Sequence, residues 1–141
     1  MKRIILLILI YSFNGYAQES KIVSFKVDGE IYKVPMGKAI DVKDGEIDFS
    51  VKRINESAKA RYEFMIKILD FLDDFTKRYI EDLDSYLILG SKSFGNDKTH
   101  FYHFFKKGDD NQGISILVQC PYDSNEKNKE EIYRVVKSAH F

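Results

Sequence analysis

Cysteine is almost absent from this chain: Cys120 is the only one among 141 residues. A single thiol cannot form an intramolecular disulfide, so a domain with this sequence depends on an ordinary hydrophobic core for its stability. The composition supplies such a core, because 44% of the residues are hydrophobic and 14% are aromatic. We therefore expect one globular domain over residues 18–141, without disulfide bonds.

An excess of positive charge is also missing. The whole chain has 22 basic and 22 acidic residues; losing Lys2 and Arg3 with an N-terminal leader would leave 20 basic against 22 acidic residues, a net charge of −2. The two kinds of charge are interspersed along the sequence, whereas nucleic acids and anionic membranes are bound by concentrated positive surfaces. Nucleic acid is therefore excluded from the expected partners.

Long hydrophobic runs are lacking as well. Ile4–Ile10 has seven apolar residues in succession, whereas a membrane-spanning helix needs about 20. Two basic residues precede this run, and Gly15 and Ala17 place small residues at the −3 and −1 positions of a cleavage site. This pattern predicts a secretory signal peptide over residues 1–17 that is cleaved after Ala17. Cleavage would leave no stable membrane anchor and a periplasmic or secreted domain.

Two Asp-Gly pairs predict tight β-hairpins in the first third of the domain, because this dipeptide favours a type I′ turn. The first hairpin joins strands 22–27 and 30–34 through Asp28-Gly29. A two-residue turn there gives the pairs Val27 with Glu30, Phe25 with Tyr32, and Val23 with Val34.

The second hairpin joins strands 39–43 and 46–51 through Asp44-Gly45. It sets Asp41 opposite Asp48, a like-charge pair that needs water or a cation between the two carboxylates. The other pairs that the same turn rule predicts are Lys43 with Glu46, Val42 with Ile47, and Ile40 with Phe49.

Residues 55–83 predict one long α-helix, since apolar residues recur every three or four positions and Asn55 is typical of an N-cap. The apolar arc covers roughly 220° of the helix circumference, more than the stripe of a simple surface helix. We therefore expect burial on two sides. One side would meet the sheet, and the other the C-terminal helix, a loop or a second subunit, which makes a homodimer through this helix possible. The apolar residues form two rows: Tyr62, Met65, Leu69, Leu72, Tyr79 and Leu83, and beside them Phe64, Ile68, Phe71 and Phe75.

The second half of the chain predicts strands followed by a helix. Residues 86–90 indicate a buried strand, 91–98 a loop, and 107–113 a turn between strands 99–105 and 114–122. An amphipathic helix then begins near Ser124 or Asn125 and includes Ile132, Tyr133, Val135 and Val136. The fold class is therefore α+β: an antiparallel sheet of hairpins packed with one long helix and a shorter C-terminal helix.

Residues 99–105, Thr-His-Phe-Tyr-His-Phe-Phe, are the densest cluster of rings in the chain. On a helix His100 and His103 would share a face and could hold zinc, but on a strand they point to opposite faces. The aromatic content and the turn-rich flanks favour a strand, and no third ligand follows at a characteristic spacing. We therefore expect packing rather than a metal site, with a layer of protein on each face of the sheet.

Cys120 has two interpretations. As a small core residue, it would share a strand face with Ile114, Ile116 and Val118, and this is the interpretation that we favour. Alternatively, it would be the nucleophile of a small thiol hydrolase with His103 or another histidine as its base, since a catalytic thiol needs a histidine neighbour and a depressed pKa.

No other constellation of reactive residues is apparent, and we expect no cofactor. Residues 109–111, Asp-Asp-Asn, superficially suggest calcium, but the ligand ladder of an EF-hand is missing. Binding residues concentrate on loops, which makes segments 91–98 and 107–113 the candidate partner-binding sites. Their candidate residues are Phe94, Asn96, Asp97, Lys107, Asp109, Asp110 and Asn111.

The end of the chain, Ile116–Pro121 followed by 128–141, has a strand, a charged linker and a helix. This ending and the order of the elements resemble the PsbP-like α/β/α sandwich class of small exported proteins. The resemblance implies a non-enzymatic accessory role and carries over no site residues. We expect an exported binding or accessory protein that engages a protein partner or a small apolar ligand, with the thiol hydrolase as the alternative.

Overall fold

The computed structural model describes residues 22–109, 111–122 and 126–141. The predicted signal peptide, Asp110 and the predicted start of the last helix at Ser124 or Asn125 lie outside these residues. In chain order the described elements are β1 (Val23–Val27), β2 (Glu30–Val34), β3 (Ala39–Asp44), β4 (Ile47–Ile54), α2 (Ala58–Ile68), β5 (Asp74–Ile80), the 3-10 helix η1 (Glu81–Leu83), β6 (Ser85–Phe94), β7 (Asp97–Asp109), β8 (Gln112–Pro121) and α3 (Glu126–Ser138).

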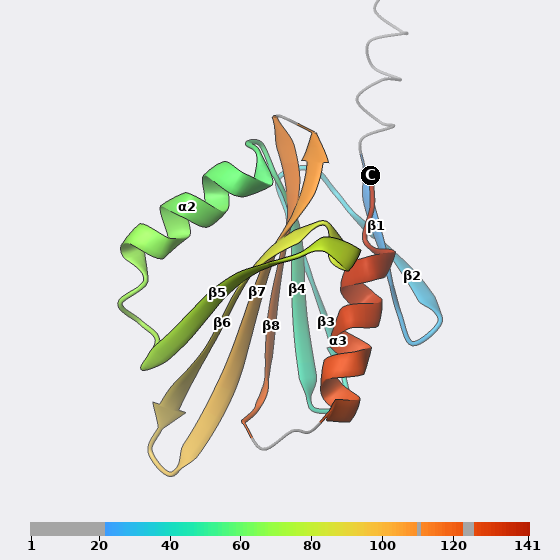
Figure 1. Cartoon of the computed structure of the whole chain (residues 1–141). Helices are drawn as coiled ribbons and strands as arrows, with labels where there is room; N and C mark the ends of the chain where they lie inside the picture. Colours follow the sequence, from blue (N-terminus) through green and yellow to red (C-terminus); the bar gives the residue numbers. More distant parts are fainter. Residues whose placement is uncertain (1–21, 110, 123–125) are drawn as a thin grey trace, which may run out of the picture.

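Six strands form one antiparallel sheet in the order β3-β4-β8-β7-β6-β5. Helix α2 lies over one face of this sheet, and α3 lies over the other together with the separate β1–β2 hairpin (Figure 1). We call these the α2 face and the α3 face. The predicted α+β class with an antiparallel sheet of hairpins is confirmed. Neither described helix combines the length and apolar character needed to cross a membrane.

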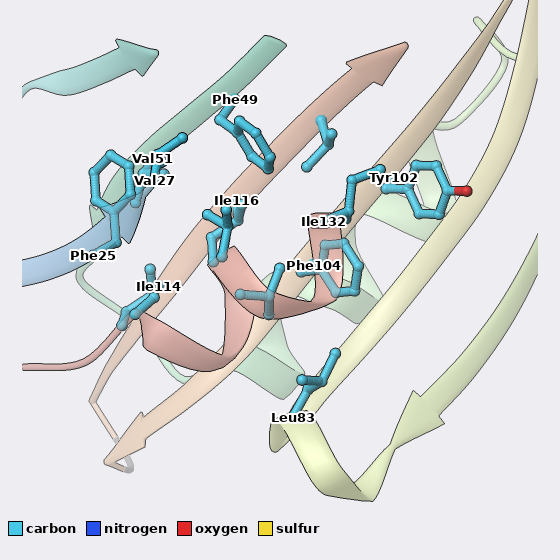
Figure 2. Close-up of a cluster of buried hydrophobic side chains, with 14 of the residues drawn as sticks. Phe25, Val27, Phe49, Val51, Leu83, Tyr102, Phe104, Ile114, Ile116 and Ile132 are labelled. Carbon is cyan, nitrogen blue, oxygen red and sulfur yellow. The ribbon is translucent and has the colours of Figure 1, made fainter. Parts of the chain in front are cut away.

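The main core fills the α3 face, where the sheet meets α3 and β1 (Figure 2). Phe104 of β7, Ile116 of β8 and Ile132 of α3 are fully buried there. Ile132, Val135 and Val136 recur at helical spacing, so α3 presents one apolar stripe to the sheet. The predicted C-terminal amphipathic helix is confirmed.

The two ends of the described chain pair with each other beside α3. Ser24 and His140 exchange two backbone hydrogen bonds of 2.8 and 2.9 Å. Lys106 of β7 holds the end of α3, because its Nζ donates to the carbonyl oxygens of Val136, Lys137 and Ala139 at 2.8, 3.1 and 2.6 Å. A cation at this position also interacts favourably with the helix dipole. The first strand, the last helix and β7 are thereby joined.

The aromatic segment lies in β7, and both faces of this strand are covered. Tyr102 and Phe104 belong to the main core, whereas Phe105 belongs to a smaller core under α2. There Phe105 packs with Ala58 and Ile88, and Tyr62 of α2 meets its ring edge-on at 6.2 Å. The predicted strand with a protein layer on each side is confirmed.

The first hairpin has the predicted register: Val23, Phe25 and Val27 pair with Val34, Tyr32 and Glu30. Its turn has positive φ at both central positions, 48° at Asp28 and 84° at Gly29. This is the requirement of a type I′ turn.

The second hairpin is shifted by two residues, so its predicted register was wrong. Asp44 pairs with Ile47, and the turn residues are therefore Gly45 and Glu46. Gly45 has a φ of 61°, and glycine at the first central position suits a type II′ turn.

The shift also changes the charge pairing of this hairpin. Asp41 lies opposite Ser50 rather than Asp48, and Lys43 lies opposite Asp48, with 3.8 Å between the charged atoms. A shift of two residues keeps every side chain on its face of the sheet, so the hydrophobic pattern does not distinguish the registers. Turn geometry and charge decide between them.

The predicted 55–83 helix was wrong in its second half. α2 ends at Ile68, and residues 74–80 form β5, which pairs with β6 along its whole length. Ser57 rather than Asn55 is the N-cap, because its side chain accepts a hydrogen bond of 3.1 Å from the Ala60 N–H. α2 has 11 residues and α3 has 13, so the C-terminal helix is the longer one. Aromatic and β-branched residues favour the ladder with β6 over continued helical spacing.

The two predicted loops are also mostly strand. β6 continues to Phe94 and β7 begins at Asp97, so two residues turn the chain there; likewise β7 continues to Asp109 and β8 begins at Gln112. The strands predicted over 86–90 and 99–105 lie within β6 and β7, and most of that predicted over 114–122 lies within β8. The polar residues near these turns, which the sequence predicted as loop, pair within the antiparallel strands.

Candidate binding surface

The candidate partner-binding residues lie at opposite ends of β7. Phe94, Asn96 and Asp97 are at the β6–β7 turn, and Lys107, Asp109 and Asn111 are at the β7–β8 turn (Figure 1). β7 has 13 residues, which span about 40 Å at roughly 3.3 Å per residue. The two predicted loops therefore cannot contribute to one site.

At the β7–β8 turn the polar residues make contacts within the protein itself. Asp109 Oδ1 accepts a hydrogen bond of 2.8 Å from the Asn111 N–H, which closes the turn. Lys107 Nζ lies 4.6 Å from the centre of the Tyr79 ring and 5.6 Å from that of Tyr86, in cation–π geometry. Lys107, Asp109 and Asn111 thus each have a contact within the fold.

The β6–β7 end carries aromatic rings that the fold leaves half open. Phe94 is 52% exposed and Phe71 is 49% exposed, and their ring centres are 6.4 Å apart. Phe71 stands edge-on to the nearly buried ring of Phe101 at 5.5 Å. We call Phe71, Phe94 and the underlying Phe101 the ring surface. Phe94 was a predicted site residue; Phe71 was assigned to a helix.

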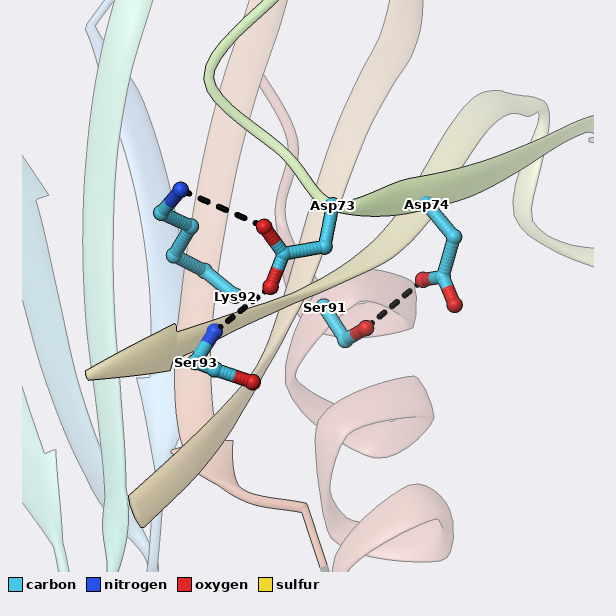
Figure 3. Close-up of polar contacts among 5 residues, drawn as sticks. All are labelled: Asp73, Asp74, Ser91, Lys92 and Ser93. Atoms are coloured by element: carbon cyan, nitrogen blue, oxygen red, sulfur yellow. Dashed lines mark hydrogen bonds and ion pairs between the residues drawn. The ribbon is translucent and has the colours of Figure 1, made fainter. Parts of the chain in front are cut away.

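A polar network joins the connection between α2 and β5 to the end of β6 (Figure 3). The Asp73 carboxylate accepts hydrogen bonds from the Ser93 N–H at 2.8 Å and from Lys92 Nζ at 3.2 Å. Ser91 Oγ donates to Asp74 at 2.6 Å, and the Asp73 N–H donates to the Ser91 carbonyl at 2.9 Å. The backbone N–H of Ser93 and the Lys92 ammonium lower the pKa of Asp73. We call these contacts the Asp73 network.

Gly90 allows the same connection to lie close against β6. A Cβ built at this position would lie 2.5 Å from the Asp74 carbonyl oxygen and 2.6 Å from Leu72 Cδ1. Lys92, which binds Asp73, also places its Nζ 5.6 Å from the centre of the Phe71 ring. The segment that carries Phe71 is thus joined to β6 by close backbone packing and the Asp73 network, and the ring itself has a cation nearby.

A polar cleft of about 510 Å³ lies at the same end of the sheet. It includes two predicted partner-binding residues, Asn96 and Asp97, and its carboxylates exceed its cations. Lys98, its one basic lining residue, lies over the Tyr122 ring at 3.9 Å. The lining is Glu46, Asp48, Asn96, Asp97, Lys98, Thr99, Gln119, Cys120, Pro121 and Tyr122.

Cys120 and His103 are not brought together. Cys120 is 4% exposed and belongs to the main core on the α3 face with Ile116 and Val118, so its predicted core position is confirmed. His103 points to the opposite face, where its Nε2 lies 2.8 Å from Ser115 Oγ. The imidazole beside Cys120 is instead that of His100, its register partner across β7 and β8.

His103 is kept neutral by its surroundings. Burial is the main cause that lowers its pKa to about 4, and the nearby Lys52 and Arg61 charges act in the same direction. His100 and His103 lie on a strand and on opposite faces, as predicted. Within the described ranges no group of three or more His, Cys, Asp or Glu side chains could hold a metal ion.

A second, larger cleft of about 820 Å³ lies between α3 and the turns of the two N-terminal hairpins. Glu131 of α3 lines it and forms an ion pair with Arg134. Burial raises the pKa of Glu131; Arg134 opposes this rise, and the Asp44 and Asp28 carboxylates add to it. Sequence reasoning missed this cleft, because its walls are far apart in the chain.

No protein-family model matches the chain, and a search of curated proteins finds no match. The ring surface and the two clefts are therefore the basis for an inference about function.

Proposed function

We propose that this chain is an exported, non-enzymatic binding or accessory protein that engages a protein partner through the ring surface. The observation that carries this proposal is that Phe71 and Phe94 are half exposed and lie 6.4 Å apart on two segments that the Asp73 network ties together. Aromatic residues are enriched in the centres of protein interfaces. A ring that is already positioned loses little conformational entropy on binding.

The geometry favours a protein partner over a small apolar ligand. Small-molecule sites enclose most of the ligand surface in a mainly apolar cavity, whereas the ring surface is open to solvent. The two clefts described above are lined largely by charged and polar side chains. The exposed aromatic rings and the enclosed clefts are therefore separate, and neither alone provides an enclosed apolar site for a small ligand.

Two further features support an exported accessory role. The predicted signal peptide over residues 1–17 directs the domain out of the cytoplasm. The helices on opposite faces of an antiparallel sheet agree with the α/β/α sandwich that the resemblance to the PsbP-like class implies. Members of that class are mostly accessory proteins without catalysis.

The alternative, a thiol hydrolase, has one geometric point in its favour: His100 lies opposite Cys120. A nucleophilic thiol must also reach its substrate, and Cys120, although it borders the polar cleft, belongs to the main core and is only 4% exposed. The binding role is therefore the proposal.

Site-specific photo-crosslinking in the native host tests the ring surface. Phe94 is replaced by photoreactive benzoylphenylalanine, and Ile31, which is 69% exposed on β2, is replaced in a control variant. We expect a discrete cross-linked product with one other protein from position 94 and not from position 31. Adding Phe71→Ser to the position-94 variant should remove the product while the protein stays folded, with a moderate loss of thermal stability because half of the ring is already exposed.

Two results would overturn the proposal. One is identical products from positions 94 and 31, which would indicate nonspecific contact. The other is the absence of any product from position 94 under conditions in which the protein is folded and exported.

A further inference from the structure

The ring surface already holds one cation of this chain. Lys92 Nζ lies 5.6 Å from the centre of the Phe71 ring and 3.2 Å from the Asp73 carboxylate. An aromatic face and a carboxylate both attract an ammonium group, and here they act on the same one. The β6–β7 end of the sheet thus shows, within the protein, how it interacts with a basic side chain.

Phe94 and Asp97 form a second pair of this kind. They are register partners across the β6–β7 turn, and directly opposed residues of an antiparallel ladder share a face, with about 5 Å between their Cβ atoms. Phe94 is 52% exposed, and Asp97 is exposed as well. A half-open ring and a carboxylate therefore lie side by side at this turn.

The two lysines close to this turn in the sequence are engaged elsewhere. Lys92 is bound by Asp73. Lys98 directly follows Asp97 in β7, so its side chain points to the opposite face, where its Nζ lies over a tyrosine ring at 3.9 Å. Among the described residues, no lysine or arginine forms an ion pair with Asp97 or lies over the Phe94 ring. The pair is thus accessible to a cation from another molecule.

The polar cleft beside the turn has the complementary charge. Asp97 lines it together with Glu46 and Asp48, against the single basic residue Lys98. Lys43 pairs with Asp48 at 3.8 Å, and within the described ranges Glu46, like Asp97, forms no ion pair. A surface with this excess of carboxylates attracts a basic side chain and repels an acidic one.

We propose that the partner segment bound at the ring surface carries an arginine, whose guanidinium stacks on Phe94 and pairs with Asp97. This inference rests on the proposed function and names the chemistry of its partner: an apolar side chain against Phe71, next to an arginine on Phe94. Arginine fits better than lysine, because its flat guanidinium stacks on aromatic faces and pairs with a carboxylate through two parallel N–H groups.

Nuclear magnetic resonance titration with three short peptides tests the inference, using the chain from Gln18 onward, which contains every described residue. The probes are acetyl-Gly-Leu-Arg-Leu-Gly-amide and the same peptide with glutamine or glutamate in place of arginine. We expect the arginine peptide to shift the amide signals of Gly95, Asn96 and Asp97. It should bind about tenfold more tightly than the glutamine peptide, which loses an ion pair and a cation–π contact, and the glutamate peptide should bind most weakly.

Charge variants of Asp97 identify the group that reads the arginine. Asp97→Asn should remove the preference for the arginine peptide over the glutamine peptide, and Asp97→Lys should make the glutamate peptide the tightest binder. Glu81→Gln is the matched control: it removes an exposed carboxylate in η1, towards the β7–β8 end, and should leave the preference unchanged. Because Asp97 is exposed at a turn, its variants should fold, which the dispersion of their spectra checks.

Two results would overturn the inference: no shift at residues 95–97 with the arginine peptide at several millimolar, or a preference for arginine that is absent in the unaltered chain or persists in Asp97→Asn. The cross-linking at position 94 tests the proposed function separately. A discrete cross-linked product together with peptides that charge does not distinguish would show that the ring surface binds a partner without an arginine. If that product is missing as well, the partner site itself is wrong.

Discussion

At the scale of single residues, His103 shows how the small core under α2 depends on an uncharged group. Its ring stacks on Phe105 with 4.1 Å between the centres, and Nε2 is within hydrogen-bond distance of the Ser115 hydroxyl. Lys52 and Arg61 are the charges that act on it, and both are positive. A proton on this ring would be buried, would face like charges and would have no carboxylate partner.

Stability should therefore fall as the solution becomes acidic. Well above pH 6.5 His103 is neutral in both the folded and the unfolded state and contributes nothing to the pH dependence of stability. Below it the unfolded chain takes up a proton that the folded protein refuses until about pH 4, which costs up to about 3 kcal/mol of unfolding free energy. Urea unfolding of the native chain and of His103→Gln at pH 7.0 and 4.5 checks this, and the variant should lose clearly less stability.

The matched control for this measurement is His140→Gln, since His140 lies at the surface near the end of α3. Its pH profile should follow that of the unaltered chain. Equal losses for His103→Gln and the unaltered chain would show that other groups carry the acid sensitivity.

At the scale of elements, the break between α2 and β5 shapes the candidate site. It brings Phe71 to the end of β6 and aligns Asp73 with Ser93 and Lys92. Gly90 makes this approach possible, because any side chain there would meet the backbone of Asp74. The pairing of β5 with β6 therefore places the half-exposed Phe71 beside Phe94.

Gly90→Ala should destabilise the protein by about 1–3 kcal/mol, as overpacking of a closely packed contact does. Denaturant unfolding measures the loss. Adding Leu72→Ala removes one of the two clashing groups but not the Asp74 carbonyl, so the double variant should not regain stability. Full recovery of stability in the double variant would contradict this, because it would show that only the Leu72 side chain, and not the Asp74 carbonyl, limits the space beside Gly90.

Much of this fold could be predicted from local patterns, and the exceptions have physical causes. The first hairpin, the β7 strand and α3 follow from turn chemistry, aromatic content and helical periodicity. The register of the second hairpin was not predicted. Asp44-Gly45-Glu46 can form two different turns, and the two resulting registers place the same residues on the same faces of the sheet. β5 was not predicted either, because residues 74–80 keep a helical spacing and become a strand through their pairing with β6, the next strand in the chain.

The candidate site was also predictable only in part. Phe94, Asn96 and Asp97 were found because they flank a glycine turn. Phe71 and Asp73 were missed, because their role depends on where α2 ends. His100 beside Cys120 depends on the β7–β8 register, which the sequence does not show.

At the scale of the whole molecule, the sheet separates a large core on the α3 face from a small one on the α2 face. Cys120 belongs to the large core and is only 4% exposed where it borders the polar cleft, so we expect its thiol to react mainly when the core opens. Near neutral pH it should react with a thiol reagent at least about a thousandfold more slowly in the native chain than in the unfolded chain. Rapid labelling of the folded protein would instead favour the thiol hydrolase.

The pairing of Ser24 with His140 has a consequence for how the molecule is made. β1, the first described strand, pairs with β2 and also forms an isolated bridge with His140, which lies 116 residues after Ser24. Such long-range contacts delay folding, so the layer that holds α3 stays incomplete while the polypeptide is still being extended. A chain that must be threaded through a translocation channel before it folds would gain from that delay.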